Sequence, residues 1–122
     1  MNTRERSKIV SDWLAIAEGP LPGKWTQSEE KLTRLIKDDP ATAWSIVTTL
    51  IDQACSDEAV SFLAASPLED LLSAHGPALI EAVERRARNN RRFRDALSGL
   101  RQLRMTDEVW TRVKQAAEVG GA

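Results

Sequence analysis

The fold of this chain is decided most clearly by residues 66–77, which are Ser66-Pro67-Leu68-Glu69-Asp70-Leu71-Leu72-Ser73-Ala74-His75-Gly76-Pro77. Ser66 is a favoured N-cap residue, Pro67 suits the first helical position, and Glu69 is placed to complete a capping box. Gly76 suits the left-handed position after a helix end, and Pro77 then starts a new segment. A helix of about two turns is unstable alone, so neighbours must pack against it. This stretch predicts an array of short helices that support one another.

The same start and stop signals divide the whole chain into seven or eight short helices. Apolar residues recur every three or four positions over 3–18, 27–37, 40–54, 57–64, 67–75, 77–88, 91–100 and 107–117. Capping side chains precede most of these segments, namely Asn2, Thr26, Asp39, Ser56, Asn90 and Thr106. No long segment alternates with period two, which argues against strands. We predict an all-α fold, either a compact irregular bundle or stacked helical hairpins.

Length and composition indicate one soluble domain over residues 1–122, with 119–122 as a flexible tail. The chain has 122 residues, of which 42% are hydrophobic and 29% charged, as is ordinary for a globular protein. It has no apolar run of membrane-spanning length and no signal-peptide core. Cys55 is the only cysteine, so no internal disulfide can form, and we expect a cytoplasmic protein. Trp13, Trp44 and Trp110 lie on apolar stripes and are expected in the core.

Candidate catalytic residues are few, and each has a structural interpretation. Five acidic pairs fall at or next to expected helix starts, where the helix dipole favours negative charge: Glu29-Glu30, Asp38-Asp39, Asp57-Glu58, Glu69-Asp70 and Asp107-Glu108. The single histidine, His75, is expected to cap or pack at a helix end, and Cys55 is expected to be buried. No phosphate-loop, nucleophile or zinc motif is present. We expect no catalytic residue, metal or cofactor; the remaining enzymatic alternative uses His75 with Glu69 or Asp70.

The strongest electrostatic signal is a cluster of eight arginines with one acid, Asp95, between residues 85 and 104. We call these residues the arginine corner: Arg85, Arg86, Arg88, Arg91, Arg92, Arg94, Arg101 and Arg104. Arginine is favoured near a helix C-terminus but not near an N-terminus, where Arg91 and Arg92 are expected. The corner is therefore predicted to bind the acidic surface of another protein. Two alternatives are a solvated corner paired with Glu81, Glu84 and Asp95, and a nucleic-acid site.

The nucleic-acid alternative is less well supported by the composition. The net charge is −1, the pI is about 5.9, and Phe93 is the only aromatic residue among the arginines.

A second partner-binding candidate is Trp25, in the irregular stretch Gly19-Pro20-Leu21-Pro22-Gly23-Lys24-Trp25. Its side chain either folds over the core as a lid or stands at the surface as a binding anchor.

Several blocks of the chain resemble a family of short bacterial proteins that is catalogued only as a domain of unknown function. The blocks are Phe62 to Leu72, His75-Gly76, Arg92-Phe93-Arg94 and Asp107 to Val113, within residues 40–115. The Pro-Leu-Glu-Asp-Leu-Leu…His-Gly block is the most recognisable. The resemblance implies a small, all-α, cytoplasmic bacterial protein, and supplies no activity, cofactor or catalytic residue.

Together these observations predict a non-catalytic protein–protein interaction module. Small stand-alone bacterial helical proteins often serve as adaptors, immunity proteins or phage-type inhibitors of a host system. The expected partner is a protein with an acidic surface, bound at the arginine corner with Trp25 as a second anchor. The alternative is a nucleic-acid-associated regulator that uses the same arginines.

Overall fold

The computed structural model describes residues 1–19 and 27–118, which form seven α-helices and one π-helical turn and contain no strand. The all-α prediction is therefore confirmed. Trp25, the expected cap Thr26 and the expected tail 119–122 lie outside the described residues. The elements are α1 (Thr3–Glu18), α2 (Gln27–Asp38), α3 (Pro40–Gln53), α4 (Asp57–Leu63), η1 (Ala64–Leu68), α5 (Glu69–Asn89), α6 (Arg91–Ser98) and α7 (Asp107–Glu118).

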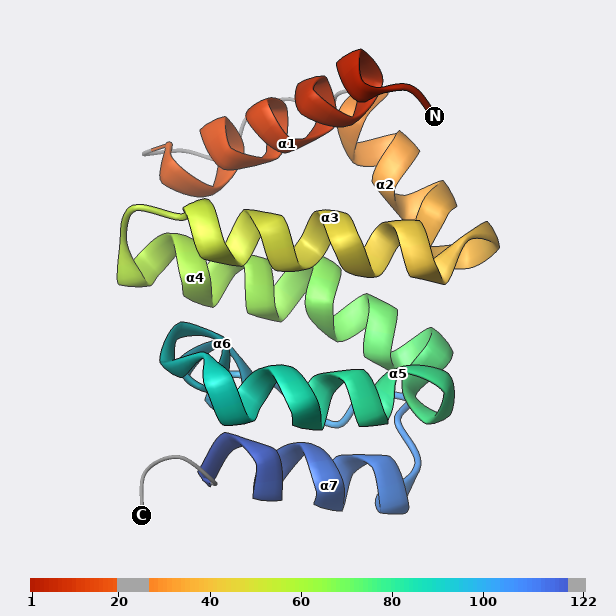
Figure 1. Cartoon of the computed structure of the whole chain (residues 1–122), viewed down its shortest axis with the longest axis vertical. Coiled ribbons are helices and arrows are strands. Elements are labelled where there is room, and N and C mark those ends of the chain that lie inside the picture. The colour runs from red at the N-terminus through yellow and green to blue at the C-terminus, as the bar shows by residue number, and fades with distance from the viewer. Residues whose placement is uncertain (20–26, 119–122) are drawn as a thin grey trace.

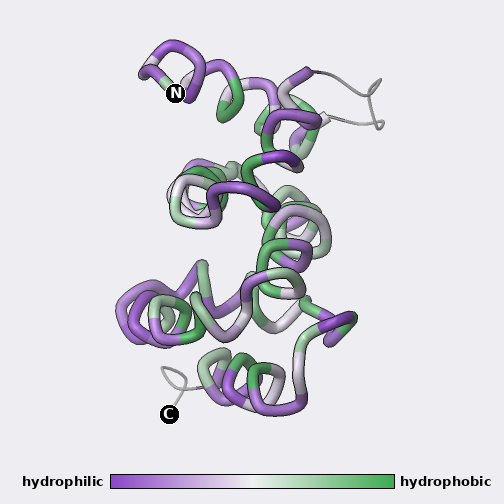
Figure 2. Tube along the Cα trace, turned by 90° about the vertical axis from the view of Figure 1, so that its right-hand side faces the viewer, coloured by the Kyte–Doolittle hydropathy of each residue, from purple (hydrophilic) through white to green (hydrophobic). Residues whose placement is uncertain are grey.

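The helices stack as hairpins along the long axis of the molecule. Helices α1, α3, α5 and α7 lie one beneath another (Figure 1), and each contacts the next. We call this row the helix ladder. Helices α2, α4 and α6 connect its rungs and pack against them. The inner sides of the coils carry most of the hydrophobic residues (Figure 2), so each pair of hairpins buries apolar surface between them.

Ser66 and Pro67 do not start a new helix, contrary to the prediction. Helix α4, η1 and α5 follow one another without a break, so the described residues form six separate helical rods rather than seven or eight. Pro67 lies inside the π-helical turn and is buried. A proline has no backbone N–H for the hydrogen bonds of a helix, and its ring crowds the preceding turn. A wider π turn is one way in which a helix accommodates it.

The predicted end of this stretch is correct in place but differs in conformation. His75 has φ −134° and ψ 26°, which kinks α5 just before Pro77. Pro77 cannot donate to the carbonyl four residues earlier, so the hydrogen bonding of the helix is interrupted there and the helix kinks. Gly76 does not have the expected positive φ. It is needed instead for close packing, because a Cβ there would lie 2.8 Å from Val109 Cγ1 on α7.

The core contains residues from every helix and includes most of those predicted. Fully buried side chains include Leu32, Ile46, Leu50, Leu71, Leu72, Val83 and Phe93. Trp13 is buried, and its Nε1 donates to the Ser28 carbonyl at 3.3 Å. Trp44 and Trp110 are only partly buried against this core. Trp44 packs edge-on against Phe93, with ring centroids 5.6 Å apart, and leaves part of its indole accessible.

Five of the predicted helix caps are confirmed. The side chains of Asn2, Asp39, Ser56, Asn90 and Thr106 accept hydrogen bonds from backbone N–H groups three residues later, at 2.8 to 3.3 Å. These bonds satisfy amides that have no partner within the first turn of a helix.

Candidate functional site

The arginine corner lies around the turn between α5 and α6 and along the connection to α7, and its eight residues fall into two groups. Four form hydrogen bonds through their guanidinium groups: Arg86, Arg92, Arg94 and Arg101. The other four are exposed and form no side-chain hydrogen bond or ion pair within the described residues: Arg85, Arg88, Arg91 and Arg104. The corner is therefore partly a structural device and partly an available cationic surface.

Arg92 and Arg94 have a structural role that the sequence analysis missed. Arg92 Nη1 donates to the carbonyl oxygens of Ala54 and Ile51 at the end of α3. Arg94 Nη1 donates to the carbonyl of Ala87, in the last turn of α5, at 2.6 Å. Helix C-terminal carbonyls lack partners within their own helix and carry partial negative charge. The positive charge of Arg92 is therefore unfavourable at the N-terminus of its own helix, α6, but it stabilises the C-terminus of α3.

Arg101 is paired with the most deeply buried carboxylate in the described part of the chain. Glu69 is 1% exposed, and its Oε1 accepts from the Arg101 backbone N–H at 2.6 Å. Its two oxygens also contact the Arg101 guanidinium at 3.3 and 3.4 Å. The pair Glu69-Asp70 was expected at a helix start, and it lies instead within a continuous helical rod. Glu69 therefore secures the connection between α6 and α7, because charged hydrogen bonds stabilise a buried carboxylate.

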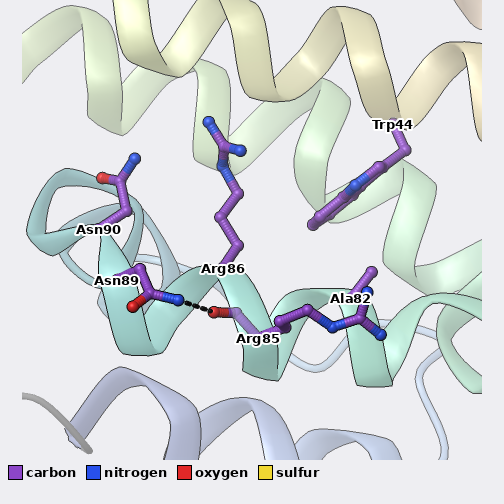
Figure 3. Close-up of a pocket in the computed structure, with 6 residues that line it drawn as sticks. All are labelled: Trp44, Ala82, Arg85, Arg86, Asn89 and Asn90. Carbon is purple, nitrogen blue, oxygen red and sulfur yellow. Dashed lines mark hydrogen bonds between the residues drawn. The ribbon is translucent and has the colours of Figure 1, made fainter.

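Arg86 forms one wall of an open hollow of about 350 Å³ between α3 and α5 (Figure 3). The hollow is lined by Trp44, Ala82, Arg85, Arg86, Asn89 and Asn90. Asp52 holds two of these residues in place: it forms an ion pair with Arg86 and accepts from Asn90 Nδ2 at 3.1 Å. The Arg86 guanidinium also lies 5.8 Å from the centre of the Phe93 ring.

Arg85 differs from Arg86 because its guanidinium is free of partners among the described residues. The backbone carbonyl of Arg85 accepts from Asn89 Nδ2 at 3.2 Å (Figure 3), and this bond places the Asn89 side chain beside the hollow. The hollow therefore presents a free guanidinium, carboxamides and an indole to solvent. Guanidinium groups and carboxamides recognise carboxylates and peptide groups, so this arrangement suits an acidic peptide or protein surface.

On the other side of α5, Arg88 and Glu84 line a smaller hollow against α7. Arg112 on α7 contacts both oxygens of Glu84, at 2.9 and 2.5 Å. Hydrogen bonding from Arg112 lowers the pKa of Glu84. The negative charge of Glu84 is therefore compensated by Arg112 within the fold. Arg88 remains as the exposed cation beside this hollow.

The structure gives His75 and Glu69 separate structural partners. His75 Nε2 lies 2.6 Å from the Ile36 carbonyl at the end of α2, which confirms the expected capping or packing role. Glu69 is held by Arg101. Partial burial raises the pKa of Asp70, and the nearby charge of Arg104 opposes that rise. No contact within the described residues brings His75 together with either carboxylate as the enzymatic alternative would need.

The expectation that Cys55 is buried is wrong. Helix α3 ends at Gln53, and Ala54 adopts an extended conformation, so Cys55 leaves the apolar stripe and is exposed. Its backbone N–H donates to Glu18 Oε2 at 3.0 Å. The interaction with the Glu18 carboxylate raises the pKa of the Cys55 thiol, which disfavours the nucleophilic thiolate.

Two further features of the described residues bear on function. No group of three or more His, Cys, Asp or Glu side chains there is close enough to hold a metal ion. No helix among them combines the length and apolar character needed to cross a membrane.

Comparison with known proteins identifies a family without assigning an activity. No curated protein and no solved structure was found to match the chain. Residues 17–120 match the model of a family described as a family of unknown function (DUF6869), and the match covers most of the described helices. The description of the family names no activity. The chain belongs to this family, DUF6869.

Proposed function

We propose that the protein is a non-catalytic interaction module that binds the acidic surface of another protein. The observation that carries this proposal is the free guanidinium of Arg85 beside the hollow of Trp44, Arg86 and Asn89. Asp52 lies nearby but already bonds Arg86 and Asn90, so Arg85 has no carboxylate of its own among the described residues. A partner's carboxylate would supply it.

Two more exposed arginines extend this cationic surface around the α5–α6 turn. Arg85 and Arg88 lie in the last turns of α5, and Arg91 begins α6 after the extended residue Asn90. An exposed cation at the rim of an interface accelerates association with an acidic partner. The role suits an adaptor, an immunity protein or a phage-type inhibitor that acts in the bacterial cytoplasm.

The alternative of nucleic-acid binding is less well supported than the sequence alone suggested. Arg92 and Arg94 bond helix carbonyls, and Arg86 and Arg101 bond carboxylates. Half of the corner's positive charge is therefore engaged within the fold, and phosphate binding depends on free cations.

The proposal is tested by affinity capture from a lysate of the native organism, followed by a binding measurement with the purified captured protein. Arg85→Glu should weaken binding at least tenfold, whereas Arg34→Glu should bind like the parent. Arg34 is a matched control because it is exposed on α2, away from the corner. Equal binding by both variants, or displacement of the captured protein by random duplex DNA, would contradict the proposal.

A further inference from the structure

The hollow at Arg85 is one of three that lie between successive rungs of the helix ladder. Above it, a hollow of about 300 Å³ lies between α1 and α3 and is lined partly by Thr49 and Gln53. Below it, a hollow of about 120 Å³ lies between α5 and α7 and is lined by Glu84, Arg88, Gln115 and Ala116. Each step of the ladder, from α1 to α3 to α5 to α7 (Figure 1), therefore has a hollow of its own.

Helical spacing shows that the three hollows border the same exposed strips of the ladder. Arg85 and Asn89 line the middle hollow, and Arg88 lines the lower one. Arg85 and Arg88 are three residues apart and are therefore neighbours on the helix surface. One exposed strip of α5 thus lies between these two hollows, with one hollow along each edge. On α3, Thr49 lines the upper hollow, and Asp52, three residues further along, forms an ion pair with Arg86 in the wall of the middle one.

The hollows also share a chemical composition. Each is lined by an exposed carboxamide and by at least one arginine: Gln53 with Arg6, Asn89 with Arg85 and Arg86, and Gln115 with Arg88. Arg6 is engaged with Ser45 and Thr49, and Arg86 with Asp52, so the free cations among the described residues of the hollows are Arg85 and Arg88. Neither Gln53 nor Gln115 forms a side-chain hydrogen bond within the described residues, and Asn89 uses only one of its N–H groups. A carboxamide both donates and accepts, so it can bond one peptide group of an extended chain at two points.

From this pattern we infer that the ladder binds an extended, acidic peptide segment of the partner protein, laid across α1, α3, α5 and α7. This inference rests on the proposed function and defines its mode of binding. Packed helices lie about 8–10 Å apart, and an extended chain advances about 3.3 Å per residue, so neighbouring hollows are about three residues apart along the peptide. A segment of about seven to nine residues spans all three.

An extended segment fits this surface better than a helical one. The backbone groups of a helix are bonded within the helix itself, so they would leave the three carboxamides unpaired. The backbone groups of an extended chain are available at every residue, and two acidic side chains about three residues apart would meet Arg85 and Arg88.

The test begins with a phage-displayed library of random dodecapeptides selected on the full chain. We expect enriched sequences with Asp or Glu at intervals of about three residues. One enriched peptide is then synthesised, labelled and titrated against the parent and its variants by fluorescence polarisation. Gln53→Ala and Gln115→Ala should each weaken binding about three- to tenfold, the effect of losing one or two hydrogen bonds. Arg85→Glu should weaken it at least tenfold.

Gln27→Ala and Arg34→Glu are the matched controls, because both residues are exposed on α2 and outside the three hollows. Thermal unfolding verifies that each variant is folded. If Arg85→Glu abolishes binding while Gln53→Ala and Gln115→Ala bind like the parent, the extended groove is refuted and the proposed function stands. If no acidic sequence is enriched, or if Arg85→Glu binds normally, both are refuted.

Discussion

Replacement of Gly76 by alanine tests whether close approach of α5 and α7 organises the C-terminal half of the molecule. The new Cβ would lie 2.8 Å from Val109 Cγ1 and 3.3 Å from Cγ2. Favourable carbon contacts begin at about 3.5 Å, so Val109 or a whole helix must shift by roughly 0.7 Å. Overpacking of this kind costs about 1–3 kcal/mol, and the better helix propensity of alanine returns up to about 1 kcal/mol. We expect the free energy of unfolding to fall by up to about 3 kcal/mol.

Val109→Ala in the same background identifies the cause. Alone, it removes two buried methyl groups and should cost about 1.5–3 kcal/mol. In the double variant, the methyl group introduced at position 76 occupies the space that the valine side chain vacates. The double variant should therefore lose less stability than the two single variants together, by about 1–3 kcal/mol. Urea unfolding followed by circular dichroism measures all four proteins of this cycle.

Gly99→Ala is the matched control for these measurements. Its Cβ would meet only the Ala96 carbonyl oxygen, at 3.6 Å, which is an ordinary contact, and its φ is −92°. The variant should unfold within about 0.5 kcal/mol of the parent. Strict additivity of Gly76→Ala and Val109→Ala, or equal effects of the two glycine substitutions, would refute the packing argument.

Single substitutions at Arg92, Leu103 and Glu84 test two contacts and one backbone conformation. Arg92→Gln should lower the free energy of unfolding by about 1–3 kcal/mol, since it leaves carbonyls at the end of α3 unpaired, whereas urea unfolding of Arg91→Gln should match the parent within about 0.5 kcal/mol. Leu103 is 52% exposed and has φ 44°, so Leu103→Gly should raise the midpoint of thermal unfolding, and a lower midpoint would contradict this interpretation. Because Arg112 lowers the pKa of Glu84 below its ordinary value of 4.5, that pair stabilises the protein above pH 4.5 and loses its effect as the pH falls through the folded pKa. In urea unfolding, Glu84→Gln should therefore be less stable than the parent at pH 7, and this difference should shrink as the pH falls below 4.5. A difference that stays constant with pH would contradict a contribution from the Glu84 carboxylate.

Helix starts were predictable because their signals act over three residues. The caps Asn2, Asp39, Ser56, Asn90 and Thr106 each bond an amide within the first turn, so sequence spacing is sufficient. Ser66 and Pro67 carry the same local signal and fail. There the helix continues because Leu63, Ala64 and Leu68 are buried against neighbouring helices, and burial of three apolar side chains outweighs a cap of about 1 kcal/mol.

The candidate site was predictable as a charged region but not in its composition. The density of arginines indicated the corner. No feature of the neighbouring sequence shows that Arg92 bonds the end of α3 while the guanidinium of Arg85 stays free among the described residues. Arg85 and Asn89 are four residues apart and share one helix face, so the spacing alone could have predicted that Asn89 lies beside Arg85. Gln53 and Gln115 carry no such signal, because their significance depends on helices that pack against their own.

The sequence by itself determined that this is an all-α protein, where most of its helices begin, and that positive charge gathers at one corner. Tertiary structure alone decided which charges remain available. Arg92 meets the carbonyl of Ala54 across 38 positions, and Glu69 meets Arg101 across 32. Capping and periodicity are properties of neighbouring residues, whereas the pairing of a guanidinium depends on which distant carbonyl or carboxylate the packed helices bring within hydrogen-bonding distance.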